Sequence, residues 1–510
     1  MPQQVRFFES FKNGLLPDAK IPRNMQYLLE LDNLRATEYG IKACETVSAF
    51  VADAVLTSAS VTKAHPFPQT FRGKGVTLLC TATKVYSVNE GTGAITQLTT
   101  YDLHTPASTK AITTGGPWQF VDFHTNWMLF NGACVVFKLG WVDAAKVFVQ
   151  DTVTVLSGAD YRGRLMMGGF NSANFWSSAW GTLWETMIDQ ATDWGFALQA
   201  PSNNWVYWSA PGGGDFMMLF LSTLATANVA SVTGGHDADD PLFLDFARRV
   251  SSGFMPMDWQ GDIMNLAPME DFVLVCGEDG ISGVIAYPEP VPTFGLKNLL
   301  IPTGLASRNS IGGTIRRKVL VDAEGNLWSI SSAMQTNRLG YKDYFVGMLG
   351  DHISVCFDPV QEEFWIGNDE EQFVLSSTGL GRAPRIVNSL HRVGGGLAGI
   401  SAAHASPTVP LVETIEHDFG TRAIKTITRL ELSGFDTPGV TFRVYWRMAR
   451  SAAFTLVTVV ADGYGVGHCR ISGIEFRFGI TAANATGLTI DDLIVTLDDE
   501  AKVDMRALLA

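Results

Sequence analysis

The segment KVLVDAEGNLWSIS (318–331) has a shape that the chain repeats and that decides its fold class. Two runs of β-favouring residues flank the polar stretch DAEGN (322–326). Glycine and asparagine readily adopt the positive φ that a tight reversal needs, so the segment is predicted to form a β-hairpin. The same shape recurs in four other stretches, at 78–98, 127–142, 271–287 and 353–377.

The composition is that of a folded, strand-rich protein. The chain has 510 residues, of which 46% are hydrophobic and 17% charged, with 50 glycines. Its formal net charge of −14 argues against a surface that binds nucleic acid by neutralising phosphates. The six cysteines lie far apart, without the close pairs of zinc or redox motifs. Buried free thiols are therefore expected, which suits assembly in a reducing cytoplasm.

Neither a signal peptide nor a membrane span is expected. The stretch MPQQVRFFESFKNG at the start lacks the apolar core of a signal peptide. The longest apolar run, 216–230, is shorter than the roughly 20 residues of a membrane-spanning helix and contains Ser, Thr and Asn. A buried or subunit-facing segment is the favoured interpretation.

The order of patterns predicts an all-β chain with several parts. Many short strands allow a propeller, a sandwich or a barrel, and the long series of hairpins favours an irregular β-propeller of about five to seven blades, because radial repetition leaves few exposed edges. Strict period-two alternation in VTFRVYWRM and IEFRFGI predicts a C-terminal β-sandwich. The predicted parts are an N-terminal arm at 1–45, the propeller at 46–393, a linker at 394–410, the sandwich at 411–499 and a C-terminal tail at 500–510.

The interval at about 165–260 breaks the hairpin pattern and is predicted to be a partly helical insertion. Trp176, Trp180 and Trp184 follow helical spacing, which indicates either a core stripe or an anchor against a neighbouring subunit. Residues 236–253 are predicted to form a short helix. Its acidic residues fit capping and solvation better than calcium binding, since the glycine and closing glutamate of an EF-hand loop are missing.

The sequence nominates no catalytic residue, no metal ligand and no cofactor, so the chain is not expected to be an enzyme. It has no phosphate-binding loop, HExxH, GxSxG or GxGxxG motif. His417 and Asp418 are neighbours that a strand would point to opposite faces. The turn DAEGNLW distantly resembles the aspartate-box turn of sialidase propellers, which is structural. Propeller glycosidases stay open, because their carboxylates come from different blades and leave no local motif.

The order of parts resembles the tail nozzle proteins of short-tailed bacteriophages, also called packaged-DNA stabilisation proteins. The resemblance includes NLRATEYGIK (33–42), MDWQGDIMNLAPMEDFVLVCGEDGI (257–281) and LTIDDLIVTLDD (488–499). It covers much of the chain as a pattern, and residues 165–260 depart from it.

The resemblance implies a hexameric ring below the portal and its adaptor, in a virion tail assembled in the host cytoplasm. DNA would pass through a central channel without sequence-specific binding, with which the negative net charge agrees. The candidate contacts with neighbouring subunits are Arg6, Phe7 and Phe8 in the arm and Trp180 and Trp184 in the insertion.

Two other functions are weighed against the nozzle. One is a carbohydrate-binding or glycan-cleaving propeller, such as a tail receptor-binding protein. The other is a cellular propeller scaffold, which the lack of regular repeats disfavours.

Overall fold

The fold was examined in a computed structural model. It describes residues 3–17, 26–51, 55–56, 69–102, 105–123, 126–138, 145–151, 154–171, 202–209, 253–287, 294–350, 352–368, 370–383, 387, 389–393, 395–400, 409–421, 423–434, 439–483 and 487–498.

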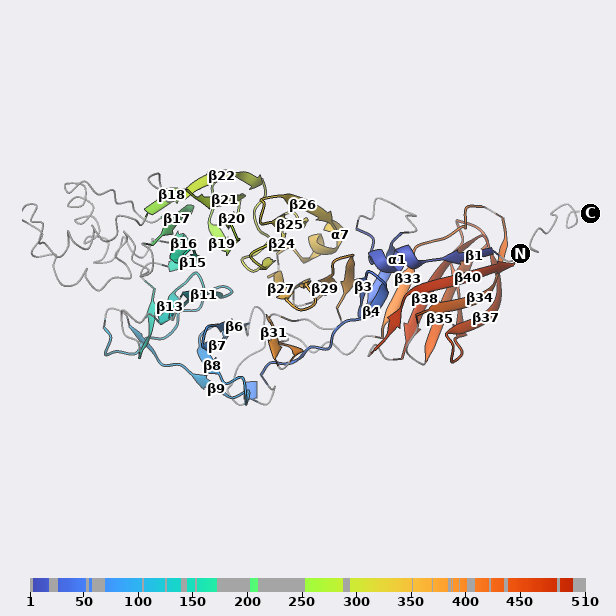
Figure 1. Ribbon diagram of the computed structural model, residues 1–510, viewed down its shortest axis with the longest axis horizontal. Coiled ribbons are helices and arrows are strands. Elements are labelled where there is room, and N and C mark those ends of the chain that lie inside the picture. The colour runs from blue at the N-terminus through green and yellow to red at the C-terminus, as the bar shows by residue number, and fades with distance from the viewer. Residues whose placement is uncertain are drawn as a thin grey trace, which may run out of the picture. The chain divides into compact units, whose positions relative to one another are not determined.

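The chain is all-β, as predicted: strands dominate every part that is described (Figure 1). The helical segments among the described residues are short: α1 (Phe8–Asn13), α7 (Lys342–Phe345), η3 (Val346–Met348) and two helical residues at 55–56. All five hairpins expected from the sequence are present as pairs of consecutive strands.

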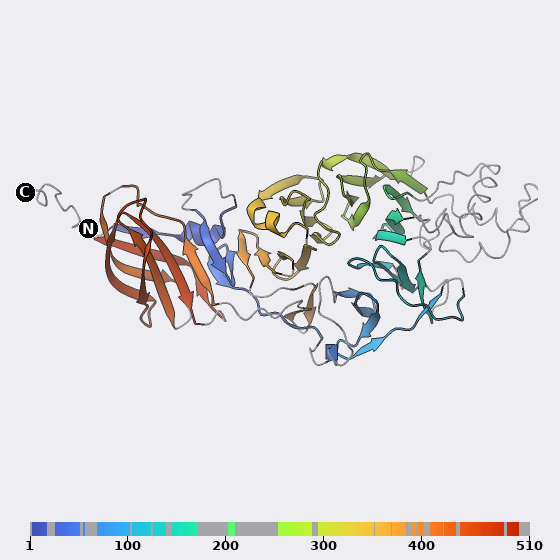
Figure 2. The ribbon, with the colours of Figure 1, turned by 180° about the vertical axis from the view of Figure 1, so that it is seen from behind.

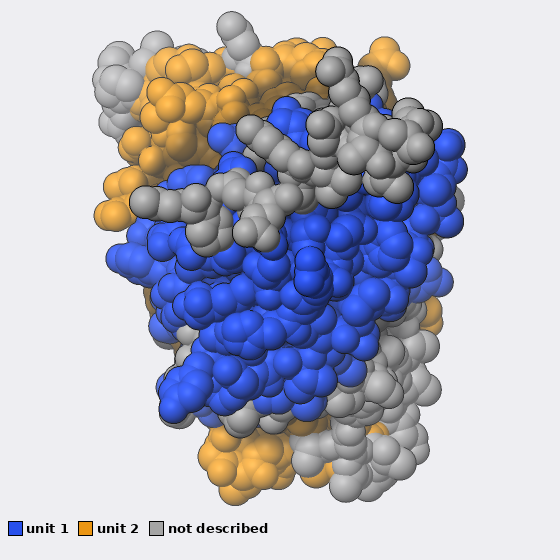
Figure 3. Space-filling view, turned by 90° about the vertical axis from the view of Figure 1, so that its right-hand side faces the viewer, with its two compact units in different colours: residues 1–48, 340–347, 356–510 blue, residues 49–339, 348–355 orange. Residues whose placement is uncertain are grey.

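The chain divides into two compact units, which are coloured separately in Figure 3. Unit 1 contains residues 1–48, 340–347 and 356–510, and unit 2 contains residues 49–339 and 348–355. The domain limits drawn from the sequence stay predictions.

Unit 2 contains five consecutive antiparallel sheets, apart from one parallel pair in the second. The first has β6 (Gln69–Gly73), β7 (Val76–Cys80), β8 (Val85–Val88) and β9 (Ile95–Gln97). The second has β10 (Thr100–Asp102), β11 (Gln119–Phe123), β12 (Asn126–Phe130), β13 (Val135–Lys138) and β14 (Val147–Gln150). The third has β15 (Thr154–Tyr161), β16 (Arg164–Asn171), β17 (Trp205–Trp208) and β18 (Gly253–Pro256). The fourth has β19 (Ile263–Pro268), β20 (Phe272–Gly277), β21 (Ile281–Ala286) and β22 (Phe294–Ile301). The fifth has β23 (Ile311–Gly313), β24 (Arg317–Val321), β25 (Leu327–Ser331) and β26 (Thr336–Gly340).

These five sheets pack side by side like propeller blades. Edge strand β6 contacts β11, β11 contacts β15, and β15 contacts β19, so the corresponding edges of successive sheets meet. Figure 2 shows the same succession of sheets from behind. Closure of the blades into a complete wheel stays a prediction.

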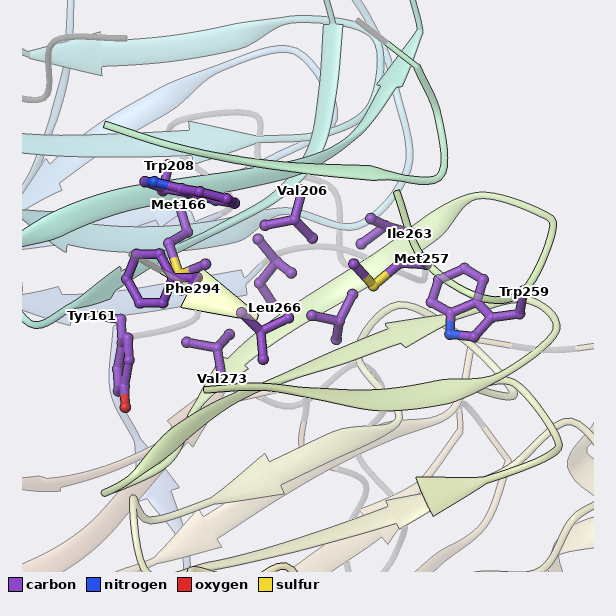
Figure 4. Packing of buried hydrophobic residues seen from close by; sticks show 13 residues of the cluster. Tyr161, Met166, Val206, Trp208, Met257, Trp259, Ile263, Leu266, Val273 and Phe294 are labelled. Atoms are coloured by element: carbon purple, nitrogen blue, oxygen red, sulfur yellow. The ribbon is translucent and has the colours of Figure 1, made fainter. Parts of the chain in front are cut away.

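Apolar side chains fill the spaces between neighbouring sheets. Between the third and fourth sheets, the ring of Trp208 packs edge-on against Phe294 at 5.1 Å, and Tyr161 lies 6.0 Å from Phe294 (Figure 4). Similar clusters join the first sheet to the second and the fourth to the fifth. Burial of these side chains holds the blades together.

The predicted insertion contains part of a blade. Its described residues include β17, β18 and most of β16, which pair in order with β15. The sequence missed this because long stretches of chain separate the three strands. Three tryptophans, Trp176, Trp180 and Trp184, lie outside the described residues, as does the apolar run 216–230. So does the helix predicted at 236–253, apart from Gly253, which begins β18.

The opening segment forms the predicted hairpin, β24 and β25, with Val321 paired to Leu327. Asp322 fixes its turn from a fully buried position. One carboxylate oxygen accepts hydrogen bonds from the backbone N–H groups of Glu324 and Asn326, at 2.9 and 2.8 Å. The other accepts from the indole of Trp328 at 2.8 Å. The turn is therefore held by a carboxylate that makes no ion pair with any described residue.

Other hairpins use the same device. The side-chain oxygen of Asn89 accepts hydrogen bonds from Gly91 and Thr92, and that of Asn131 accepts from Ala133 and Cys134. Short polar side chains that bind the backbone two or three residues on are typical of tight turns. This chemistry explains why the chain keeps returning to one shape.

Unit 1 contains two facing sheets, the second of which includes one parallel pair. One consists of β1 (Gln3–Arg6), β40 (Asp492–Asp498), β34 (Lys425–Ser433) and β37 (Val466–Gly473), in that order. The other ends in β2 (Leu28–Asp32), β33 (Leu411–Thr414), β38 (Glu475–Ala482), β35 (Val440–Arg447) and β36 (Thr455–Val460). At Gly467 an added Cβ would come within 2.8 Å of Phe442, so β37 packs directly on β35.

The remaining strands of the second sheet are β30 (Leu380–Arg382), β29 (Gln372–Leu375), β28 (Glu363–Gly367) and β27 (Ser354–Asp358). Two small sheets contain β3 (Leu34–Thr37), β4 (Gly40–Ala43) and β39 (Thr489–Ile490), and β31 (Ser389–Val393), β32 (Gly396–Ile400) and β5 (Ser48–Ala49).

The alternation predicted for the C-terminal strands holds at Val440, Phe442 and Val444, which are buried on β35, and at Phe476 and Phe478, which are buried on β38. It breaks near the end of β35, where Tyr445 is buried and Trp446 is half-buried. Residues 28–32, within the predicted N-terminal arm, form strand β2 of the second sheet.

Candidate functional site

A pocket of about 550 Å³ lies in unit 2, at the ends of several sheets. Its lining includes Gly115, Gly116, Asn131, Gly132, Leu156 and Arg308. Gly115 and Gly116 precede β11, Asn131 and Gly132 form the turn after β12, and Arg308 lies between β22 and β23. The pocket therefore draws on three sheets and on the segment that enters the fifth.

Arg308 reaches across this pocket to two other sheets. Its Nη2 donates hydrogen bonds to the carbonyl oxygens of Phe130, at 3.3 Å, and Leu156. Its own carbonyl accepts from the side-chain amides of Gln119, at 3.1 Å, and Asn265, at 2.8 Å. Both ends of the residue are thus fixed by neutral groups.

The charge of Arg308 is buried without a partner of opposite sign among the described residues. The residue is 8% exposed, and burial lowers its pKa to about 10, so it stays protonated at neutral pH. Its buried Nε has no hydrogen-bond partner. Such a cation is costly to bury unless something compensates it.

In the sandwich of unit 1, one sheet ends in strands β1 and β37, and the other ends in β36. Among the described strands, none pairs with the outer side of β36 or of β1, so both are open edges. The sequence of β36, TLVTVV, carries no charge, with Val460 75% exposed and Leu456 44% exposed. Because β36 contacts β37, which lies at the far edge from β1, the open edges at β36 and β1 are on opposite sides of the sandwich.

The predicted contact residues near the start of the chain have different environments. Phe7 is buried in unit 1, where its ring lies 4.7 Å from that of His417 and 5.5 Å from that of Phe478. Phe8 is 36% exposed, and the side chain of Arg6 is 69% exposed and 3.9 Å from Asp492. Arg6, the last residue of β1, and Phe8, the first residue of α1, are therefore accessible. Trp180 and Trp184 lie outside the described residues, and contact with other subunits stays a prediction for all five.

Most buried carboxylates of unit 1 are bound by arginines. Arg392 pairs with both Glu45 and Asp358, Arg35 pairs with Glu363, and Arg447 and Arg450 both pair with Glu475. Burial raises the pKa of Glu363, and Arg35 opposes that shift. These groups have structural partners that satisfy their charge.

Glu30 and Glu413 lie opposite each other on neighbouring strands and form a pair of carboxylates. Burial first, and then repulsion from Glu413 and Asp32, raises the pKa of Glu30. Glu413 accepts a hydrogen bond from the Tyr445 hydroxyl at 2.6 Å and lies 3.4 Å from Arg443. This pair is therefore embedded in neutralising contacts.

The cysteines are free, as expected from their spacing, and four of the six are buried. Burial raises the pKa of Cys134 to about 12 and that of Cys469 to about 11. Thiols with pKa values this high are poor nucleophiles at neutral pH.

His417 is a buried base with no described hydrogen-bond partner at either ring nitrogen. Burial lowers its pKa to about 4, and the nearby Asp418 opposes the shift. The ring is therefore neutral in the folded protein and packs between aromatic side chains.

Lowering the pH is expected to destabilise unit 1 through His417. Because the folded pKa lies below the ordinary value near 6.5, the unfolded state binds the proton more tightly. The stabilisation is complete above pH 6.5 and is lost as the pH falls to 4, by roughly 3 kcal/mol. Urea unfolding at pH 7 and pH 4 should show a smaller pH effect in H417F than in wild type, and equal pH effects would contradict this assignment.

Among the described residues, no three His, Cys, Asp or Glu side chains come together in a way that could hold a metal ion. In the same residues, no helix has the length and apolar character needed to cross a membrane.

Comparison with known proteins does not assign a family. No family profile matches the chain, and no curated protein matches it. Among solved structures, a complex of KlAtg21 with the coiled-coil of AgAtg16 has a TM-score of 0.33 at 10% identity, over 61% of this chain and 81% of that one. A likeness of this degree says nothing about function.

Arg308 could not have been singled out from the sequence. Nothing in the loop ASRNS (306–310) separates this arginine from the other basic residues. The open edge at β36 could have been predicted from the sequence. Six consecutive uncharged residues rich in valine and threonine follow a strand whose apolar and polar residues alternate.

Proposed function

We propose that the chain is a structural virion protein, a tail nozzle subunit that forms a ring around the DNA exit channel below the portal and adaptor. The sequence resemblance motivates the proposal, and the pair of open edges on opposite sides of the sandwich carries it. In the ring, β36 of one copy meets the β1 edge of the next. Contact between two different surfaces of identical subunits generates rings or filaments.

The character of the two edges supports this contact. Sheets in isolated proteins usually protect an edge with charges, proline or a bulge, and β36 has no charge or proline. Exposed Val460, Leu456 and Tyr464 add apolar surface beside it, and Tyr464 is 87% exposed. Strand β1 supplies the exposed Arg6, and the exposed Phe8 follows at the start of α1.

The electrostatic balance supports a passive channel. A protein with net charge −14 repels DNA on average, so the genome would pass without being bound by sequence. Under this proposal the ring is a hexamer that binds portal, adaptor and other tail proteins, and the protein resides in the virion tail and catalyses no reaction.

Placing charges on β36 is expected to abolish assembly. In the double variant L456K/V460K both lysines would be solvated in the monomer but would face the neighbouring copy in the ring. The apparent dissociation constant should rise at least roughly tenfold, as measured by analytical ultracentrifugation.

The control is V360K, because Val360 is 64% exposed in the same unit but lies in a turn between β27 and β28. It should assemble as wild type does. Unchanged assembly of L456K/V460K would refute the role of this edge, and a binding signal from wild type in a glycan array, together with a monomeric state, would favour the carbohydrate-binding alternative.

A further inference from the structure

We propose that the pocket around Arg308 binds the anionic group of a small organic molecule, a carboxylate or a phosphate. This site is independent of the ring proposed above, since it is built entirely from residues of unit 2.

The hydrogen-bonding of Arg308 leaves a defined position for the anion. The two hydrogens of Nη2 are directed to two backbone carbonyls, so a bidentate contact with a carboxylate is excluded. Nη1 has no hydrogen-bond acceptor among the described residues. A Cβ built on either Gly116 or Gly132 would lie 3.4 Å from Nη1, so Nη1 is next to backbone that carries no side chain. The geometry therefore offers one-point binding at Nη1.

The guanidinium is held in place before any ligand arrives. Its carbonyl is bound by Gln119 and Asn265, and its Nη2 is bound by Phe130 and Leu156. A donor that is already ordered loses little entropy on binding, which favours affinity.

The charge balance of the pocket favours an anion. None of its described lining residues is Asp or Glu, and Arg308 makes no ion pair with any described residue. An anion at Nη1 would compensate a cation that neutral carbonyls compensate only in part.

The size of the pocket indicates a small molecule. A volume of about 550 Å³ falls within the range of ordinary ligand pockets. Leu156, Met264 and Pro117 supply apolar contacts for the rest of the ligand. A molecule of monosaccharide size with one acidic group fits this description.

Calorimetric titration of the full chain with three matched sugars tests the proposal. Glucuronate carries a carboxylate, glucose 6-phosphate carries a phosphate, and glucose carries neither. At least one charged sugar should bind roughly tenfold or more tightly than glucose, because hydrogen bonds to charged groups are the stronger kind. The difference in affinity between the two charged sugars shows whether the pocket prefers a carboxylate or a phosphate. If neither binds better than glucose, the proposal is wrong.

Two variants locate the binding. R308Q removes the charge and should reduce the affinity for the charged sugar to that for glucose. Because Arg308 also holds Phe130 and Leu156, a second variant, G116A, keeps the arginine and places a methyl group 3.4 Å from Nη1. It should weaken binding roughly tenfold. The control is G91A, whose added methyl would meet only Asn89 Oδ1, at 3.4 Å, in a turn of the first sheet.

The outcome is decided even if R308Q does not fold. Wild-type affinity in folded G116A would overturn the proposal, as would wild-type affinity in R308Q. Loss in G116A with full binding in G91A supports it.

Discussion

Replacing Asp322 by alanine is expected to lower the free energy of unfolding of unit 2 by roughly 3–5 kcal/mol. The buried carboxylate accepts hydrogen bonds from the backbone of Glu324 and Asn326 and from the side chains of Thr303 and Trp328. Alanine would leave these donors buried without an acceptor, and the cost of an unsatisfied buried donor exceeds the net gain of an average hydrogen bond. Urea unfolding measures the loss, and hydrogen exchange of the 303–331 peptides locates it.

Two further variants test whether the loss of stability comes from the missing hydrogen-bond acceptor rather than from the smaller side chain. D322N keeps the size of the side chain but turns one acceptor into a donor that faces Trp328, so it should also destabilise the turn. T314A removes a turn oxygen that accepts from Arg316 and Arg317 at an exposed position, and should change stability by less than about 0.5 kcal/mol. A loss below about 1 kcal/mol in D322A would show that the turn does not depend on this carboxylate.

Replacing Arg392 by methionine is expected to destabilise unit 1 by about 3–5 kcal/mol. The guanidinium donates to Asp358, through Nε at 2.9 Å, and to Glu45, through Nη1 at 2.6 Å. The side chain of Asp358 is only 1% exposed, so the variant would leave a buried carboxylate without its cation. Chemical denaturation of the two proteins measures the difference.

Adding D358N to R392M should recover part of this loss of stability. The asparagine carries no charge, and its side-chain oxygen can still accept the hydrogen bond from the backbone N–H of Val360. R316M is the surface control, since Arg316 is 81% exposed and 3.8 Å from Glu270, and a change of at most about 1 kcal/mol is expected. Two results would show that the ion pair does not stabilise unit 1 as argued. One is an equal loss of free energy of unfolding in R392M and R316M, and the other is a larger loss in R392M/D358N than in R392M alone.

Local patterns predicted the five hairpins and the strands of the C-terminal sandwich. Alternation on β35 and β38 identified which side chains are buried, because neighbours along a strand point to opposite faces. The turn residues at Asn89 and Asn131 identified two hairpins, because their side chains bind backbone only two or three residues away. These signals lie within a few residues of one another in the sequence.

Contacts between segments far apart in the sequence could not be predicted from such local patterns. Strand β1 pairs with β40 near the other end of the chain, with Val5 opposite Val495. Strands β17 and β18 complete a sheet after long intervening segments. Arg308 meets Phe130 and Leu156, which belong to other sheets. A single sequence does not carry the register of such pairings, so both the arm at the sheet edge and the buried arginine appear only in three dimensions.

Electron cryomicroscopy of the purified protein at micromolar concentration tests the central claim most directly. The account predicts closed rings of identical subunits around a channel, with the β36 edge of each copy against the β1 edge of the next. Particles that are monomeric at every concentration, or rings in which both edges face solvent, would contradict it.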